Sequence, residues 1–141
     1  MVLALTLTLT LAAPPESAPA PRLIGEYIVL ETRTTKLGGF IDLPAKPGPW
    51  PVVIIHAGSG PTNKDGNGPF IGTDCYKMLG RALASEGIAV LRIDKRGVGS
   101  SLFAVLRQED LRFEHYADDV RDWTALLRKR SEERRVGKSV D

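Results

Sequence analysis

The chain has 141 residues, a length that suits one domain of about 100–200 residues, and its content of 43% hydrophobic and 26% charged residues is that of a globular protein. This composition excludes a disordered tail, a collagen-like repeat and a polytopic membrane protein. The formal net charge is +2, and the basic residues are concentrated in 128–141, so the body of the chain is nearly neutral and charge gives no case for nucleic-acid binding.

The sequence offers few residues that could hold a metal. Cys75 is the only cysteine, so these residues can form neither an internal disulfide nor a cysteine-ligated zinc site. His56 and His115 are the only histidines. We therefore expect no metal and no cofactor, and we expect Cys75 to be a small core residue on a helix.

The first 13 residues, MVLALTLTLTLAA, form an uncharged run too short for the ~20 residues of a membrane span. An apolar run followed by the Pro-rich residues 14–21 is typical of a secretory signal with its cleavage zone. This interpretation assigns a signal peptide and spacer to 1–20 and a secreted or periplasmic location. The alternative is that this end forms a strand, because Leu and Thr alternate from Leu3 to Leu11. In that case the protein would be cytoplasmic.

Four strands are predicted along the body of the chain. Alternating residues over 27–31, a turn at 36–39 and an apolar run over 40–43 predict two short antiparallel strands. The β-branched run over 52–55 has no polar alternation, which is typical of a strand buried on both faces of a parallel sheet. Another apolar run, over 88–94, predicts the last strand.

Two helices are predicted. The first follows Thr73, a suitable cap, and stops at Gly87. The second covers 113–130, where apolar residues recur at helical spacing. That apolar face contains Phe113, Tyr116, Ala117, Val120, Trp123, Thr124 and Leu127. The solvated face is expected to hold the acidic group Asp118, Asp119 and Asp122 together with Glu114, Arg121 and Arg128.

The order strand, helix, strand, helix predicts a parallel sheet with ligands beyond the carboxyl ends of its strands. Two glycine-containing loops, 57–72 and 95–101, begin at those ends. Small residues at 57–60 leave backbone N–H groups uncovered, so they could donate to a developing oxyanion. A phosphate cradle uses the same property and remains an open alternative.

The segments His-Ala-Gly-Ser-Gly-Pro at 56–61 and Asp-Lys-Arg-Gly-Val-Gly-Ser-Ser at 94–101 resemble the oxyanion loop and the DxRGxGxS turn of the α/β-hydrolase superfamily. The resemblance covers about residues 25–130, the N-terminal half of such a domain. It implies a partial α/β-hydrolase fold, with a mostly parallel sheet and an antiparallel N-terminal strand pair. It also implies hydrolysis of a carboxylic ester or related acyl bond by a serine nucleophile.

By this resemblance, Gly58 or Ser59 supplies a backbone N–H to the oxyanion hole. His56 would shape the loop and would not be the catalytic histidine. The turn residues are expected to brace the site rather than touch substrate, and they are Asp94, Arg96, Gly97, Gly99 and Ser101.

No serine of the 141 residues lies in a G-x-S-x-G nucleophile elbow. We therefore expect residues 22–130 to be part of a hydrolase domain and the chain alone to be inactive. Residues 131–141 are expected to be a basic tail, for which we hypothesise a foreign or frame-shifted origin. An acyl-peptide or proline-directed peptidase shares the same loops, and a non-catalytic interaction domain is a third alternative. The expected partner of the complete enzyme is a small acyl substrate, with no nucleic acid and no stable membrane anchor.

Overall fold

The computed structural model describes residues 23–105 and 107–137, so the predicted signal region and residues 138–141 lie outside the described residues. Its elements are β1 (Ile24–Glu31), β2 (Lys36–Leu43), β3 (Val52–His56), α1 (Cys75–Ser85), β4 (Ala89–Ile93), the short 3-10 helices η1 (Gly99–Ala104) and η2 (Gln108–Asp110), and α2 (Phe113–Gly137). None of the described helices has the length and apolar character needed to cross a membrane.

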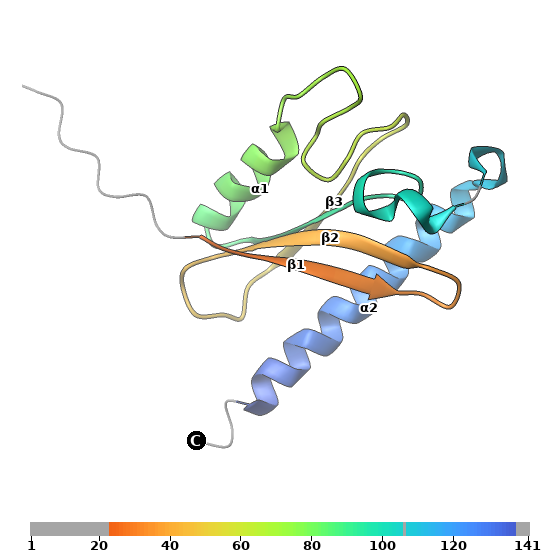
Figure 1. Cartoon of the computed structure of the whole chain (residues 1–141). Coiled ribbons are helices and arrows are strands. Elements are labelled where there is room, and N and C mark those ends of the chain that lie inside the picture. The colour runs from red at the N-terminus through yellow and green to blue at the C-terminus, as the bar shows by residue number, and fades with distance from the viewer. Residues whose placement is uncertain (1–22, 106, 138–141) are drawn as a thin grey trace, which may run out of the picture.

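The four strands form one mixed sheet in the order β1-β2-β4-β3 (Figure 1). β2 pairs antiparallel with both β1 and β4, and only β3 and β4 are parallel. The expected partial α/β-hydrolase fold with a mostly parallel sheet is therefore wrong. The reason is that β2 lies inside the sheet, between β1 and β4, so its reversed direction determines two of the three pairings.

The turn between β1 and β2 lies earlier in the chain than predicted. Thr32 N–H donates to the Thr35 carbonyl at 2.8 Å, and Thr35 N–H donates to Thr32 Oγ1 at 3.0 Å. These bonds close the turn without glycine. Gly38 and Gly39 belong to β2 instead, where a Cβ at Gly39 would lie 3.1 Å from the Arg92 carbonyl oxygen.

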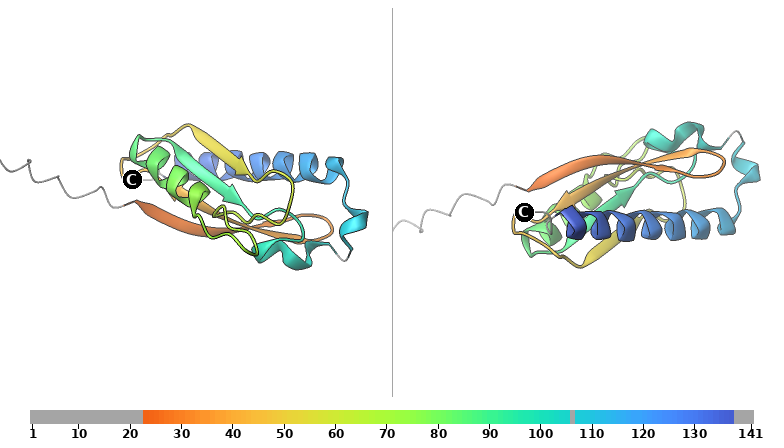
Figure 2. Two further views of the ribbon diagram at one scale, coloured as in Figure 1. Left: turned by 90° about the horizontal axis from the view of Figure 1, so that it is seen from above. Right: turned by 90° about the horizontal axis from the view of Figure 1, so that it is seen from below.

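The two α-helices cover opposite faces of the sheet (Figure 2). In the view from above α1 lies in front of the sheet, and in the view from below α2 lies in front of it. The main core lies on the α2 face, where alternate residues of the strands meet Trp123. Its buried members are Ile28, Leu30, Leu37, Ile41, Leu43, Ala89, Leu91, Ile93 and Trp123. The sheet therefore has one strongly apolar face, against α2.

The α1 face carries a buried ion pair. Arg92 Nε on β4 donates to Asp42 Oδ2 on β2 at 2.7 Å, and both residues are buried. Gly80 of α1 lies above this pair, since a Cβ there would approach Asp42 Oδ2 to 2.7 Å. α1 therefore packs closely onto β2 and β4, and a larger residue at position 80 would have to displace the Asp42 carboxylate.

β3 is more exposed than its apolar sequence predicts. Val52 is 46% exposed and Val53 is 39% exposed, so the expectation of a strand buried on both faces is wrong. The cause is its position, because β3 is an edge strand of the described sheet. The predicted strands at 52–55 and 88–94 are otherwise confirmed, with ends shifted by one residue.

Both helices differ from prediction at their ends. α1 has Asp74 as its N-cap rather than Thr73, and Cys75 is exposed rather than a core residue. The helix 113–130 is confirmed but continues to Gly137, into the predicted basic tail. Trp123 is buried as expected, whereas Phe113 is 79% exposed.

Candidate functional site

The two glycine-containing loops follow the carboxyl ends of the parallel strands β3 and β4 (Figure 1). They line an open pocket of about 940 Å³, here called the β3/β4 pocket. The first loop contributes residues 57–61, the second contributes Lys95, Arg96 and Val98, and the start of α2 contributes Phe113 and Tyr116. The loops thus meet because their parent strands are hydrogen-bonded neighbours.

Gly58 and Ser59 are exposed residues that line this pocket. Among the described residues, neither N–H group has a hydrogen-bond acceptor. A Cβ at Gly58 would meet no atom within 4 Å, and Gly60 has φ +86°, a conformation that favours glycine. The loop therefore leaves two adjacent N–H donors open to a ligand.

His56 lies at the base of the first loop and is half-buried. Its Nδ1 lies 2.8 Å from the Ala57 carbonyl oxygen, which requires the proton on Nδ1 because a carbonyl oxygen only accepts. Its ring packs edge-on against Tyr116, with ring centroids 5.5 Å apart. His56 Nε2 is buried and has no partner among the described residues. The ring thus connects the loop to α2.

Asp94 organises the second loop from its buried position at the end of β4. Its carboxylate accepts bonds from Ser100 N–H at 2.9 Å, Ser100 Oγ at 2.6 Å and Lys64 N–H at 2.6 Å. Because Lys64 lies in the first loop, one carboxylate holds both loops. Gly99 has φ +54°, and a Cβ there would lie 2.6 Å from the Asp94 carboxylate.

Ser101 ties the turn to the sheet. Its Oγ donates to the Asp94 carbonyl at 2.7 Å and accepts from Gly38 N–H on β2 at 3.0 Å. Gly97, with φ +78°, donates its N–H to the Ser101 carbonyl at 2.9 Å. The turn is therefore closed by its own backbone and anchored to the centre of the sheet.

Arg96 anchors the second loop to α2. Its Nε and Nη2 donate to the two carboxylate oxygens of Asp119 at 2.8 and 2.7 Å. This hydrogen bonding raises the pKa of Arg96 above its ordinary value. Asp119 is buried, which corrects its expected place on the solvated face, whereas Asp118 and Asp122 are exposed. Only the tertiary fold distinguishes Asp119 from these neighbours.

The first loop is also fastened by charges that the sequence analysis missed. Arg92 Nη1 donates to Asp65 of the loop while its Nε holds Asp42 of β2. Asn63 Oδ1 accepts from Asp65 N–H and Asn67 N–H at 3.0 and 2.9 Å. These side chains hold the loop in shape although it has no regular secondary structure. The sequence signal that could have indicated this role is Arg92, an arginine inside an apolar strand.

Lys95 is the other residue that the sequence analysis missed. It is only 6% exposed and lines the β3/β4 pocket, where its Nζ donates to the Gly58 carbonyl. Burial lowers the pKa of Lys95 below its ordinary value. A lysine between the motif residues Asp94 and Arg96 thus contacts the same loop that presents Gly58 and Ser59.

The described residues contain exposed backbone N–H donors at Gly58 and Ser59 but no serine paired with a base. No described serine is hydrogen-bonded to a histidine, and the Ser100 and Ser101 hydroxyls donate to Asp94. The part of the chain that the structure describes has no cluster of His, Cys, Asp or Glu suited to a metal ion. What this arrangement can do is bind negative charge at open backbone N–H groups.

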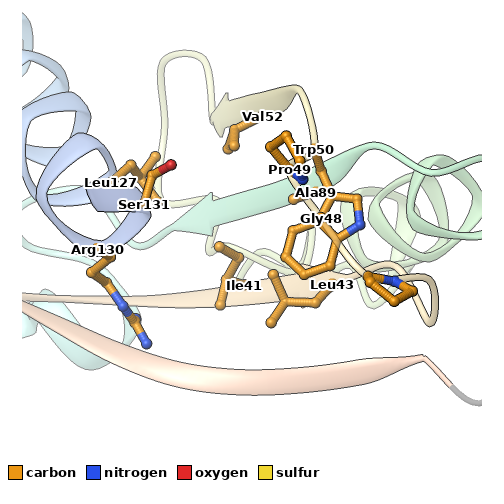
Figure 3. Close-up of a pocket in the computed structure, with 11 residues that line it drawn as sticks. Ile41, Leu43, Gly48, Pro49, Trp50, Val52, Ala89, Leu127, Arg130 and Ser131 are labelled. Carbon is orange, nitrogen blue, oxygen red and sulfur yellow. The ribbon is translucent and has the colours of Figure 1, made fainter. Parts of the chain in front are cut away.

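A second pocket, of about 520 Å³, lies at the amino ends of β3 and β4, next to Val52 and Ala89. Figure 3 shows Pro49 and Trp50 on one side and residues of α2 on the other. Arg130 at its rim donates through Nη2 to both carboxylate oxygens of Glu26 at 2.8 Å. None of the predicted site residues lines this pocket.

No protein-family model matches the chain, and a search of curated proteins finds no match to it. The function is therefore argued from the loop motifs and the geometry of the β3/β4 pocket.

Proposed function

We propose that the chain is part of a serine hydrolase that cleaves a carboxylic ester or related acyl bond, and that it contributes the oxyanion-binding loop. The observation that carries this proposal is the pair of open N–H groups at Gly58 and Ser59 in the β3/β4 pocket. Attack on an acyl carbonyl places negative charge on its oxygen, and preorganised N–H donors stabilise that charge.

The surroundings of the loop support this role. The loop is fastened to the sheet through Asp65 and to the second loop through Lys64. Donors held in this way need little reorganisation when charge develops, which is the physical basis of oxyanion stabilisation. The proposal rests on these loops and on their resemblance to those of the α/β-hydrolase superfamily, and takes no support from the direction of the strands.

The nucleophile, base and acid are not assigned to any residue of this chain. No serine among the 141 residues has the G-x-S-x-G pattern, so the chain alone is proposed to be inactive. The complete enzyme would take a small acyl substrate without a cofactor. The apolar segment followed by prolines within residues 1–20 favours a secreted or periplasmic location.

The proposal is tested by titrating the ¹⁵N-labelled chain with phenylphosphonate, a tetrahedral anion that mimics the oxyanion. We expect the amide signals of Gly58 and Ser59 to shift, with phenyl acetate, a planar neutral ester, causing much smaller shifts. Ser59→Pro removes one donor and should weaken the response, whereas Ser59→Ala keeps the N–H and should retain it. An unchanged response in Ser59→Pro, or shifts confined to other surfaces, would contradict the proposal.

Hydrolysis of p-nitrophenyl acetate provides the complementary measurement. The chain alone should give no turnover above buffer and no labelling by a fluorophosphonate. Turnover that a fluorophosphonate blocks would show that a nucleophile is present after all. Failure to bind phenylphosphonate together with absent turnover would favour the non-catalytic interaction domain.

A further inference from the structure

We propose that Lys95 is a positioning residue that orients the Gly58–Ser59 peptide and polarises the Ser59 N–H for binding an anion. The inference rests on the proposed function, because it assigns Lys95 a role in the same oxyanion-binding loop. Lys95 is not one of the three residues, serine, histidine and acid, that carry out the reaction in a serine hydrolase.

The first argument is the contact itself. Lys95 Nζ donates to the carbonyl of Gly58, a residue 37 positions earlier in the chain. No carboxylate lies within 4 Å of Lys95 Nζ among the residues that the structure describes. A buried ammonium normally has a charged partner, because its desolvation is costly. Here its hydrogen bond goes to a loop carbonyl instead.

The second argument comes from peptide geometry. The Gly58 carbonyl and the Ser59 N–H belong to one planar trans peptide unit, so they point in opposite directions. A lysine that holds the carbonyl therefore directs the N–H away from itself. This agrees with the exposure of Ser59 and with the absence of an acceptor for its N–H among the described residues.

The third argument is electrostatic. A cation at the amide oxygen stabilises the resonance form that has negative charge on oxygen and positive charge on nitrogen. The N–H of the same peptide then becomes a stronger donor, as hydrogen bonds in a chain polarise one another. Lys95 would thus strengthen the donor at Ser59 without touching the bound anion.

The backbone of Lys95 is well placed to hold this contact. Its carbonyl accepts from Val98 N–H at 3.1 Å, and its neighbours Asp94 and Arg96 are fixed by their own hydrogen bonds. The side chain therefore starts from a rigid turn. A flexible surface lysine would lose more conformational entropy in making the same bond.

The decisive measurement is the base-catalysed hydrogen exchange rate of the Ser59 amide, followed by NMR. Removal of the amide proton leaves an imidate anion with its charge on the Gly58 oxygen, which Lys95 stabilises. Lys95→Met keeps most of the length of the side chain but removes the ammonium group, and it should slow this exchange about tenfold, because the lost bond is charge-assisted. Lys95→Arg keeps the charge and should restore most of the rate.

Lys77→Met provides the matched control, because Lys77 is a partly exposed lysine paired with Asp74 and lies outside the β3/β4 pocket. It should leave Ser59 exchange unchanged. Equal Ser59 rates in the wild type and Lys95→Met would overturn the proposal. A merely structural tether would change exchange across the whole loop, and Lys95→Arg would not selectively restore Ser59.

A measurement on the wild type covers the case in which Lys95→Met does not fold. A scalar coupling between Lys95 ¹⁵Nζ and the Gly58 ¹³C carbonyl reports the hydrogen bond directly, and its absence would overturn the proposal. Failure of the phenylphosphonate titration with this coupling present would instead count against the hydrolase proposal alone. The two ideas are thereby tested separately.

Discussion

Single polar side chains join segments of this protein that are distant in sequence. Asp94 accepts hydrogen bonds from both loops of the β3/β4 pocket, and Arg92 joins β2 to the first loop. Charge-assisted bonds of this kind are stronger than neutral ones, and leaving a buried partner unsatisfied is costly. The geometry of the pocket therefore depends on a few side chains.

Asp94→Asn should destabilise the fold by about 2 kcal/mol, because the new amide places donors against the N–H groups of Lys64 or Ser100. Urea unfolding followed by Trp fluorescence measures this loss. Asp118→Asn changes an exposed carboxylate and is the control, with an expected effect below about 0.5 kcal/mol. Equal stabilities of the two variants would contradict the role given to Asp94.

Gly99→Ala should also destabilise the protein, by about 2 kcal/mol, since its φ of +54° disfavours an L side chain and the Cβ would meet the Asp94 carboxylate at 2.6 Å. Gly58→Ala is the matched comparison. A Cβ at Gly58 would have no atom within 4 Å, and this residue needs no positive φ, so that variant should remain near wild-type stability. The same urea titration distinguishes the two glycines.

Burial lowers the pKa of Lys95, which predicts a pH dependence. Between its folded pKa and its ordinary value near 10.4, the unfolded chain binds more protons than the folded protein, so the Lys95 contribution to stability rises with pH. The free energy of unfolding of the wild type, relative to that of Lys95→Met, should therefore increase toward alkaline pH. A flat or falling difference would contradict the burial of the charged amine.

At the scale of elements, the second loop and α2 are joined by the Arg96–Asp119 pair. Its two hydrogen bonds are shielded, with side-chain exposures of 14% and 3%. The start of α2 lines the β3/β4 pocket, so this pair also sets one wall of the site. This pair therefore adds a polar attachment of α2 to the second loop, beside the packing of Trp123 in the core.

A double-mutant cycle with Arg96→Ala and Asp119→Ala should give a coupling free energy of about 2 kcal/mol, as expected for a bidentate, shielded pair. The exposed pair Arg121–Asp118, with side-chain exposures of 74% and 55%, is the control and should couple by less than about 0.5 kcal/mol. Stability is measured by urea unfolding at neutral pH. Similar coupling free energies for the two pairs would contradict the proposal that Arg96 anchors the second loop to α2.

At the scale of the whole molecule, the two edges of the sheet differ. β1 carries Glu26 and Glu31, which form ion pairs with Arg130 and Lys36. β3 has only Val, Ile and one His, and it lacks the charges and prolines that protect edge strands. The β3 edge is therefore the surface on which another strand would pair.

We expect the isolated chain to self-associate through β3 at high concentration, with an apparent mass that rises in sedimentation or light-scattering measurements. Val53→Lys, on a residue that is 39% exposed, should reduce this association. Val29→Lys is a matched control on β1, where Val29 is 44% exposed, and should have little effect. A wild type that stays monomeric at all concentrations would contradict this expectation.

The sequence by itself determined the local elements: the β-branched run at β3, the helical spacing of Trp123 and the two glycine-containing loops are short-range patterns. Only the tertiary structure decided that β2 lies between β1 and β4, that Asp119 is buried and that Lys95 contacts Gly58. Strand order and buried polar pairs depend on contacts between distant residues, which local periodicity does not encode. For that reason the two loops and the bracing role of Asp94 could be predicted from the sequence, whereas the contacts made by Arg92, Lys95 and Asp119 could not.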